Sequence, residues 1–352
     1  MTYDVVVVGG SVAGAVTARE LGRRGLRVAL VEKARFPRLK PCGEGLLPHG
    51  AAALVGMGLR YPGEPVRGLR FVSPSGIVAQ ADFPWGRGMV VRRDRFDEFL
   101  LRSVGPNVDV FEGTSYDPRR FPARWIVGAD GVRSQFHRRP EFRARPPRHV
   151  RVGLSTHVRG LRIDRERVEV VLFEGGEIYL GPSHGDEALV ACLYWKEALP
   201  RGASGEERVR KTLEVRLPGR VGRLEFTSPC LALAPLGLAV NGVARDPVVL
   251  VGDAAGTLDP LTGEGMSLAI LSARAAADAI ASGDLRGYPP RRKALAAGAE
   301  WLSRWMLRAA RRPKVADRVV AALADRPALF ARLLDIATGG RVSYVALARL
   351  VL

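Results

Sequence analysis

The order of apolar and polar residues predicts a β–α–β unit at the start of the chain. Residues 5–8 are four consecutive valines, and an uninterrupted β-branched run is typical of a strand buried on both faces of a parallel sheet. Residues 15–25, AVTARELGRRG, have helical composition and end at a glycine stop. A second buried strand, RVALVE, follows at residues 27–32, and the alternation of strand, helix and strand favours an α/β fold.

Two later apolar strands end at a glycine next to an aspartate. WIVGADG, residues 125–131, is followed by a helix-start signal, and VVLVGD, residues 248–253, is followed by a loop rich in glycine and proline. That loop leads into a long alanine-rich helix that starts near Gly265. A loop that feeds the N-terminus of a helix can hold an electron-rich group, so both strand ends are candidate binding loops.

The middle and the end of the chain have different patterns. Residues 66–87 alternate and turn like a hairpin, and strand-like segments follow between residues 145 and 239, which predicts an antiparallel sheet. From residue 288 onward, apolar residues recur at helical spacing opposite arginines, with breaks at Pro313 and Pro327. We expect two or three amphipathic helices that pack on the body of the protein. The alternative is a basic element at a membrane surface that guides a lipophilic substrate.

The strongly positive charge has two interpretations. The net charge is +18, and arginine carries nearly all of the positive charge because only six residues are lysine. Such a charge is typical of proteins that bind nucleic acid or acidic membranes. The favoured interpretation is an arginine-rich solvated surface, because no recognisable nucleic-acid-binding module accompanies the charge. We therefore expect no specific nucleic-acid partner.

The sequence shows no membrane-spanning segment, signal peptide, disulfide framework or metal-ligand spacing, and these features indicate the compartment and the metal content. The longest apolar stretch, residues 230–240, is broken by a proline and a glycine and is far shorter than the roughly 20 residues of a membrane-spanning helix. A strand begins within four residues of the N-terminus, which leaves no room for a signal peptide. Cys42, Cys192 and Cys230 are too few for a disulfide framework, and the histidines lack metal-ligand spacing. We expect a cytoplasmic protein without a metal site, as a monomer or a dimer.

The turn after the first strand carries a dinucleotide-binding pattern. In GGSVAG, Gly9, Gly10 and Gly14 let the backbone approach a pyrophosphate at a helix N-terminus. Glu32 ends the second strand 18 residues after Gly14, which is the spacing of an acidic residue that binds a ribose. Ser11 replaces the middle glycine of the usual pattern, and its hydroxyl is a candidate cap for the helix. The alternative is a plain β–α–β unit that binds no nucleotide.

Three motifs together resemble the fingerprints of one superfamily of flavoproteins. GGSVAG with Glu32, GADGVRS from Gly128 and GDAAGTLDPLTGEGM from Gly252 resemble those of the flavoprotein hydroxylases. This superfamily includes group A monooxygenases such as para-hydroxybenzoate hydroxylase, flavin-dependent halogenases and geranylgeranyl reductases. The resemblance covers residues 1 to about 285 and implies a Rossmann-like FAD-binding domain, non-covalent FAD, and NAD(P)H as a transient electron donor or a separate protein partner that supplies electrons.

The resemblance also implies domain boundaries and a set of binding residues. Asp130 would lie near the pyrophosphate, Asp253 would bond the ribityl or pyrophosphate portion, and residues 260–266 would place backbone amides against the flavin ring. Arg93 matches the arginine of an R-x-x-F-D element that contacts the cofactor. The expected cofactor-binding residues are Gly9, Gly10, Ser11, Gly14, Glu32, Lys33, Cys42, Gly43, Arg93, Asp130, Gly252, Asp253, Pro260, Gly263, Gly265 and Met266. The expected division is a discontinuous FAD-binding domain (1–65, 88–140 and 240–287), an inserted antiparallel-sheet substrate domain (66–87 and 145–239) and C-terminal amphipathic helices (288–352).

The loop after the second strand helps to indicate which branch of the superfamily the chain resembles. FPRLKPCGEGLLPHG resembles the K-x-C-G-G-G loop of geranylgeranyl reductase-like proteins, with Glu44 in place of a glycine, which implies that residues 40–45 lie over the flavin. Cys42 is a candidate catalytic residue that relays protons or reacts, or else a small residue that packs in a tight loop. Against a reductase, EIYLGPSHGD has Tyr179 and Pro182 but lacks the tryptophan of the reductase Y-x-W-x-F-P segment.

The leading expectation for function is an FAD-dependent monooxygenase. It would use NAD(P)H and O2 to hydroxylate or epoxidise a hydrophobic aromatic, polyketide or isoprenoid-like small molecule, in secondary metabolism. One alternative is a geranylgeranyl reductase-like FAD-dependent ene-reductase. Another is a non-catalytic basic binding protein on a flavin fold. Peripheral membrane contact through the basic C-terminal helices is a further expectation.

Overall fold

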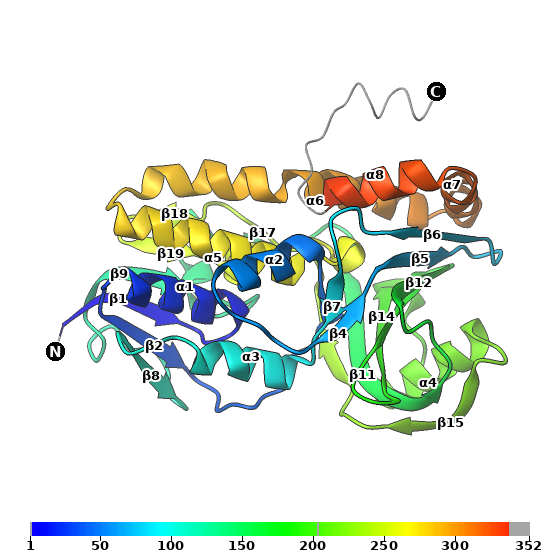
Figure 1. Ribbon diagram of the computed structural model, residues 1–352, viewed down its shortest axis with the longest axis horizontal. Coiled ribbons are helices and arrows are strands. Elements are labelled where there is room, and N and C mark those ends of the chain that lie inside the picture. The colour runs from blue at the N-terminus through cyan, green and yellow to red at the C-terminus, as the bar shows by residue number, and fades with distance from the viewer. Residues whose placement is uncertain (1, 203, 338–352) are drawn as a thin grey trace.

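The computed structural model describes residues 2–202 and 204–337. Two sheets organise it: a six-stranded sheet that includes the N-terminal strand, and an eight-stranded sheet beside it, with helices over both (Figure 1). Among the described residues, no helix is long and apolar enough to cross a membrane.

The six-stranded sheet forms the predicted dinucleotide-binding fold. Its order is β18–β19–β9–β1–β2–β8, and every neighbouring pair is parallel except β18–β19. The strands are β1 (Tyr3–Val8), β2 (Val28–Glu32), β8 (Val108–Glu112), β9 (Ala123–Gly128), β18 (Ala244–Arg245) and β19 (Val248–Leu250). Val5 and Val7 face one hydrophobic core, whereas Val6 and Val8 face a second core on the other side of the sheet. The predicted burial on both faces is confirmed.

Four helices share the hydrophobic core on the side of this sheet that carries Val5 and Val7, and α1 lies directly on β1 and β2 (Figure 1). They are α1 (Val12–Arg23), α2 (Pro48–Gly56), α3 (Arg93–Arg102) and α5 (Gly265–Ala281). Helix α5 starts at the predicted glycine. Its alanines, such as Ala273 and Ala276, are fully buried, and their small side chains allow close helix packing.

The eight-stranded sheet is the predicted antiparallel sheet. Its main order is β15–β11–β14–β13–β12–β5–β6, with β16 also paired to β11. The strands are β5 (Gly68–Val72), β6 (Val78–Asp82), β11 (Arg151–Leu161), β12 (Arg167–Phe173), β13 (Gly176–Pro182), β14 (Ala188–Trp195), β15 (Val221–Phe226) and β16 (Leu231–Leu233). The predicted hairpin is β5–β6, and it joins the sheet through a parallel pairing of β5 with β12. Helix α4 (Gly205–Arg216) packs against the face of the sheet that carries Val158 and Ile178.

Two small sheets complete the strands. One contains β3 (Gly45–Leu46), β7 (Gly88–Val90) and β4 (Glu64–Val66), and the other pairs β10 (Ala144–Arg145) with β17 (Ala239–Val240). Strand β7 leads into α3, and β3 follows directly on the Cys42 loop. Their antiparallel pairing therefore fixes that loop next to the start of α3.

The C-terminal helices pack on the body of the protein, as the favoured interpretation predicts. They are α6 (Tyr288–Ala310), α7 (Pro313–Asp325) and α8 (Pro327–Ala337), and Pro313 and Pro327 open the last two helices, a position that suits proline. The apolar faces of α7 and α8 share a core with Phe71 and Ala79 of the β5–β6 hairpin. Contact of the outer, arginine-rich faces with a membrane stays a prediction, and residues 338–352 lie outside the described residues.

Candidate functional site

A large cavity lies between the two sheets. One wall is made by the loops that follow the carboxyl ends of β1, β9 and β19, the edge at which α/β sheets bind ligands. The opposite wall is made by apolar side chains of the eight-stranded sheet, among them Leu69, Val168, Val170, Ala191 and Leu193. The space measures about 1760 Å³, including the part open to solvent. The cavity therefore has a polar backbone side and an apolar side-chain side.

The glycines of the first motif are required by close backbone contacts. A Cβ atom on Gly14 would lie 1.8 Å from the carbonyl oxygen of Gly9, and one on Gly9 would lie 2.4 Å from that of Ala129. The backbone N–H of Gly10 donates to a carboxylate oxygen of Glu32 at 2.8 Å. These contacts bring α1, β1 and β9 together at the edge of the cavity, with the acidic residue beside the turn.

The sequence prediction that Ser11 caps α1 is wrong. Its hydroxyl makes no capping bond and instead donates to Asp97 Oδ2 at 2.6 Å and accepts from Arg93 Nη2 at 2.9 Å. The reason is that a buried charged pair provides stronger partners than a backbone amide. Burial alone would raise the pKa of Asp97, but the Arg93 guanidinium outweighs it and holds that pKa below its usual value. Ser11 thus ties α1 to α3.

The other two motifs place carboxylates at the same edge. One oxygen of Asp130 accepts from the backbone N–H of Gln135 at 2.9 Å, whereas its Oδ1 is buried with no partner among the described residues. Asp253 pairs with Lys40 at 2.9 Å, and this ammonium lowers the pKa of the carboxyl group. A buried oxygen without a donor beside the cavity is what a site for a bound polar ligand leaves behind.

Glycines leave free space in the cavity wall at the Cys42 loop and at the start of α5. Cβ atoms added to Gly43, Gly263 or Gly265 would meet nothing within 4 Å, and all three residues line the cavity. Gly263 adopts φ +69°, which suits glycine. The free amides at the start of α5 lie at this wall, where they favour a ligand with negative charge.

Cys42 also lines the cavity. Its Sγ accepts from the backbone N–H of Glu44 at 3.3 Å. The Arg93 guanidinium also interacts with this sulfur electrostatically, because burial would lower the pKa of Arg93 whereas Asp97 and Cys42 raise it. Its own N–H donates to Ser155 Oγ at 3.2 Å. The sulfur therefore has one backbone donor and a guanidinium charge nearby, and both stabilise negative charge on it.

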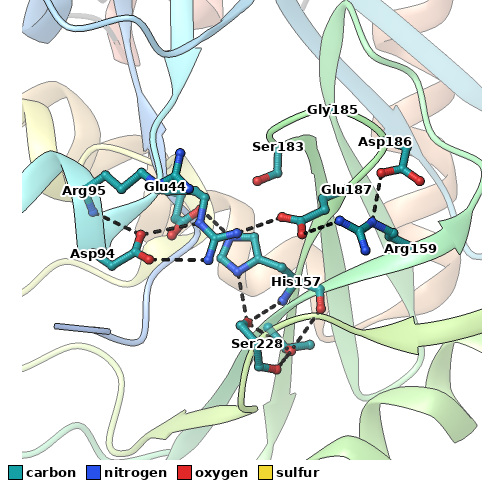
Figure 2. A network of polar contacts seen from close by, with 12 residues as sticks. Glu44, Asp94, Arg95, His157, Arg159, Ser183, Gly185, Asp186, Glu187 and Ser228 are labelled. Atoms are coloured by element: carbon teal, nitrogen blue, oxygen red, sulfur yellow. Dashed lines mark hydrogen bonds and ion pairs between the residues drawn. The ribbon is translucent and has the colours of Figure 1, made fainter. Parts of the chain in front are cut away.

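A buried polar network, drawn in Figure 2, attaches the Cys42 loop to β11. Glu44 has a left-handed backbone with φ +54°, which explains why a glycine stands here in the loop that the sequence resembles. Its carboxylate accepts from the Arg93 backbone N–H at 3.0 Å and meets His157 Nε2 at 2.8 Å. His157 Nδ1 meets Ser228 Oγ at 3.0 Å (Figure 2). These bonds stabilise a backbone conformation that is costly for a glutamate.

The structure brings together most of the predicted residues. The expected residues that line the cavity are Ser11, Cys42, Gly43, Arg93, Gly252, Asp253, Pro260, Gly263, Gly265 and Met266. Gly9, Gly10, Gly14 and Glu32 form the turn behind this wall, and Asp130 lies beside the lining residue Gly131. Lys33 is exposed and does not line the cavity.

Sequence reasoning missed His157, and it also missed Arg151 and Glu177, which pair with each other inside the eight-stranded sheet. Each is a charged or titratable residue within an apolar strand, and all three are buried. Because buried charges need partners, a polar residue in such a strand was the available signal.

The fold and the cavity define a flavin-dependent oxidoreductase. Glycine turns, an acidic residue at the end of β2, an unpaired carboxylate oxygen and free amides at α5 fit the groups of FAD. The family model described as "FAD binding domain" matches residues 2–59 and 102–289, and the chain belongs to this family. The predicted superfamily, fold and FAD cofactor are confirmed.

Known relatives include reductases, and proteins of similar fold include an oxygenase. The chain is 29% identical to a menaquinone reductase of Mycolicibacterium smegmatis over 81% of this chain and 78% of that protein. It is 28% identical to a geranylgeranyl diphosphate reductase of Rhodobacter capsulatus, over 85% and 80%. Its fold is similar to that of p-nitrophenol 4-monooxygenase of Pseudomonas putida, with a TM-score of 0.81, 20% identity and coverage of 97% and 99%. This last likeness concerns the fold alone.

Proposed function

We propose that the protein reduces a carbon–carbon double bond in a hydrophobic, isoprenoid-type substrate. The observation that carries this proposal is the position of Cys42 in the wall of an apolar cavity, with a hydrogen bond from the Glu44 N–H and the charge of the Arg93 guanidinium nearby. The two relatives described above, both named as reductases, support it. FAD, when bound and reduced by NAD(P)H or by a protein partner, supplies a hydride to one carbon of the double bond.

Cys42 supplies the proton to the second carbon. The S–H bond breaks as the new C–H bond forms, which leaves negative charge on the sulfur. Arg93 and the Glu44 N–H stabilise this charge, and they are already in place before the reaction. Arg93 itself stays protonated, because Asp97 and the cysteine side chain raise its pKa against the effect of burial.

The apolar wall fits a hydrocarbon substrate. Leu69, Val168, Val170, Ala191 and Leu193 present side chains without hydrogen-bonding groups to the cavity. Burial of each substrate CH2 group contributes about 0.8 kcal/mol, so a polyprenyl chain gains affinity without polar recognition. A site that excludes water in this way also protects a reduced cofactor from side reactions.

Monooxygenation is the alternative, and it is the function that the sequence alone favours. Double-bond reduction is preferred here because a thiol that accepts a backbone hydrogen bond beside a guanidinium charge has a direct role in it as a proton donor. Transfer of oxygen requires no such group. Cys42 is therefore the residue whose role distinguishes double-bond reduction from monooxygenation.

The test is product analysis with and without O2. Enzyme loaded with FAD and reduced chemically is mixed with geranylgeranyl diphosphate or a polyprenyl quinone, and the product mass is measured. We expect a gain of two hydrogens under anaerobic conditions, and a loss of about 10²-fold or more in rate for Cys42→Ala at unchanged FAD content. Cys230→Ser is the matched control, because Cys230 does not line the cavity. Conversion that requires O2, with labelled oxygen in the product, would establish the monooxygenase instead.

A further inference from the structure

A buried arginine connects the eight-stranded sheet to the loop that lines the other side of the cavity. Arg151 lies at the start of β11, and its side chain is only 1% exposed. One terminal nitrogen pairs with Glu177 of β13, and the other pairs with Asp259 at 2.5 Å. Asp259 lies within the lining segment of residues 256–263 and begins its last part, residues 259–263. One guanidinium therefore joins two sheet strands to this segment, which we call the 259–263 loop.

Further bonds determine the conformation of the 259–263 loop. Asp259 Oδ1, the oxygen that pairs with Arg151, also accepts from the backbone N–H of Leu261 at 3.2 Å. The Tyr179 hydroxyl donates to the carbonyl oxygen of Leu261 at 3.1 Å. Tyr179 stands two residues after Glu177, on the same face of β13, and lines the cavity. The side chains that hold the loop thus come from β11 and β13 of the sheet that forms the apolar wall of the cavity.

Stability alone is a poor explanation for this arrangement. Two buried carboxylates share one arginine, and burial raises the pKa of Glu177 to about 7 despite the nearby guanidinium. Apolar side chains of similar volume stabilise a core at least as well as a buried ion cluster. An ion cluster also fixes geometry, because the planar guanidinium holds the carboxylates of Glu177 and Asp259 in defined positions.

The Arg151 guanidinium also packs on an aromatic ring. It lies 4.9 Å from the ring centre of Trp195 at the end of β14. Arg311, which follows α6, contacts the same ring at 4.6 Å. Arg151 is therefore held in place by packing as well as by its two carboxylates, and it can transmit a displacement of the sheet to the loop.

We propose that Arg151 is a positioning residue that sets the 259–263 loop against the flavin and couples FAD binding to the substrate wall. Since coupling between two sites is reciprocal, FAD bound at the loop reduces the mobility of β13, and order in β13 strengthens FAD binding. This inference concerns binding and does not depend on the reaction that the enzyme catalyses.

The test compares Arg151→Met and Arg151→Lys with a matched control. Arg220→Met is that control, because Arg220 pairs with the buried Glu169 of β12 in the same sheet and neither residue lines the cavity. FAD affinity is measured by titration of apoprotein, and amide hydrogen exchange is measured in β13 with saturating FAD and without it. We expect Arg151→Met to weaken FAD binding at least tenfold and to remove the protection that FAD gives to β13. Arg151→Lys should restore part of both effects, and Arg220→Met should behave as the parent.

Two results would overturn the inference. One is FAD affinity of Arg151→Met within twofold of the parent. The other is equal FAD-dependent protection of β13 in parent and Arg151→Met, which would make the arginine a purely structural group. If Arg151→Met does not fold, Tyr179→Phe decides the question, because it removes the second tie to the loop without unpairing a charge. It should weaken FAD binding and reduce the protection of β13, and parent-like values of both would refute the coupling.

Discussion

The two sheets contribute to the cavity in different ways. The six-stranded sheet contributes backbone, because glycines and helix starts bring amides and carbonyls to the surface of the wall. The eight-stranded sheet contributes side chains, most of them apolar toward the cavity, and behind them the buried Arg151 connects the sheet to the 259–263 loop. A wall built from closely packed backbone tolerates few substitutions, whereas the side chains of the other wall can be replaced without a change in the fold. We therefore expect cofactor retention to depend mainly on the first region and on its tie to Arg151, and substrate choice to depend mainly on the second region.

The largest effect is expected at the backbone wall. Gly14→Ala places a Cβ atom 1.8 Å from the carbonyl oxygen of Gly9, so α1 must move away from β1. We expect a loss of more than about 3 kcal/mol in the free energy of unfolding, together with loss of FAD. Urea unfolding and flavin content measure both.

Gly56→Ala is the control for this substitution. A Cβ atom at Gly56 would meet nothing within 4 Å, so the variant should keep its FAD and gain a few tenths of a kcal/mol in stability. Equal behaviour of the two variants would contradict the idea that close backbone contact governs the first wall.

An intermediate effect is expected at the charged part of the second wall. Burial raises the pKa of Glu177 from 4.5 to about 7, so the folded protein binds this proton more tightly than the unfolded chain does. Between about pH 4.5 and 7 this group makes the parent less stable as pH rises. Glu177→Gln removes that dependence while Arg151 keeps its pairing with Asp259.

Urea unfolding of both proteins across this pH range measures the effect. The stability of Glu177→Gln relative to the parent should rise with pH by roughly 1–3 kcal/mol. A difference that is constant with pH would show that Glu177 does not titrate in this window.

A smaller effect is expected at Asp253, where the two regions meet the Cys42 loop. Asp253→Asn removes the charge that pairs with Lys40. It should weaken FAD binding by about 1–2 kcal/mol if this carboxylate also accepts a hydrogen bond from the cofactor, as the sequence resemblance implies. Asp284→Asn is the control, because Asp284 pairs with Arg286 on the surface. Titration of both apoproteins with FAD compares them, and equal affinities would remove Asp253 from the site.

The same difference explains what could be predicted from the sequence. Close backbone contacts demand glycine at fixed spacing, so Gly9, Gly14 and Glu32 were predicted together with the fold. The Ser11 hydroxyl was misassigned because its partners, Arg93 and Asp97, stand more than 80 residues away. His157 and Arg151 were missed for a similar reason. Their roles arise from contacts with loop residues far away in the chain, such as Glu44 for His157 and Asp259 for Arg151, and no local spacing in the sequence indicates these contacts.

The most direct test of the central proposal is rapid mixing without O2. Parent enzyme and Cys42→Ala, both loaded with FAD and fully reduced, are mixed with a polyprenyl substrate while the absorbance of oxidised flavin is followed. The proposal predicts rapid reoxidation of the parent flavin in step with formation of a product that carries two more hydrogens, and reoxidation about 10² times slower in the variant. A parent flavin that stays reduced until O2 is added would contradict it.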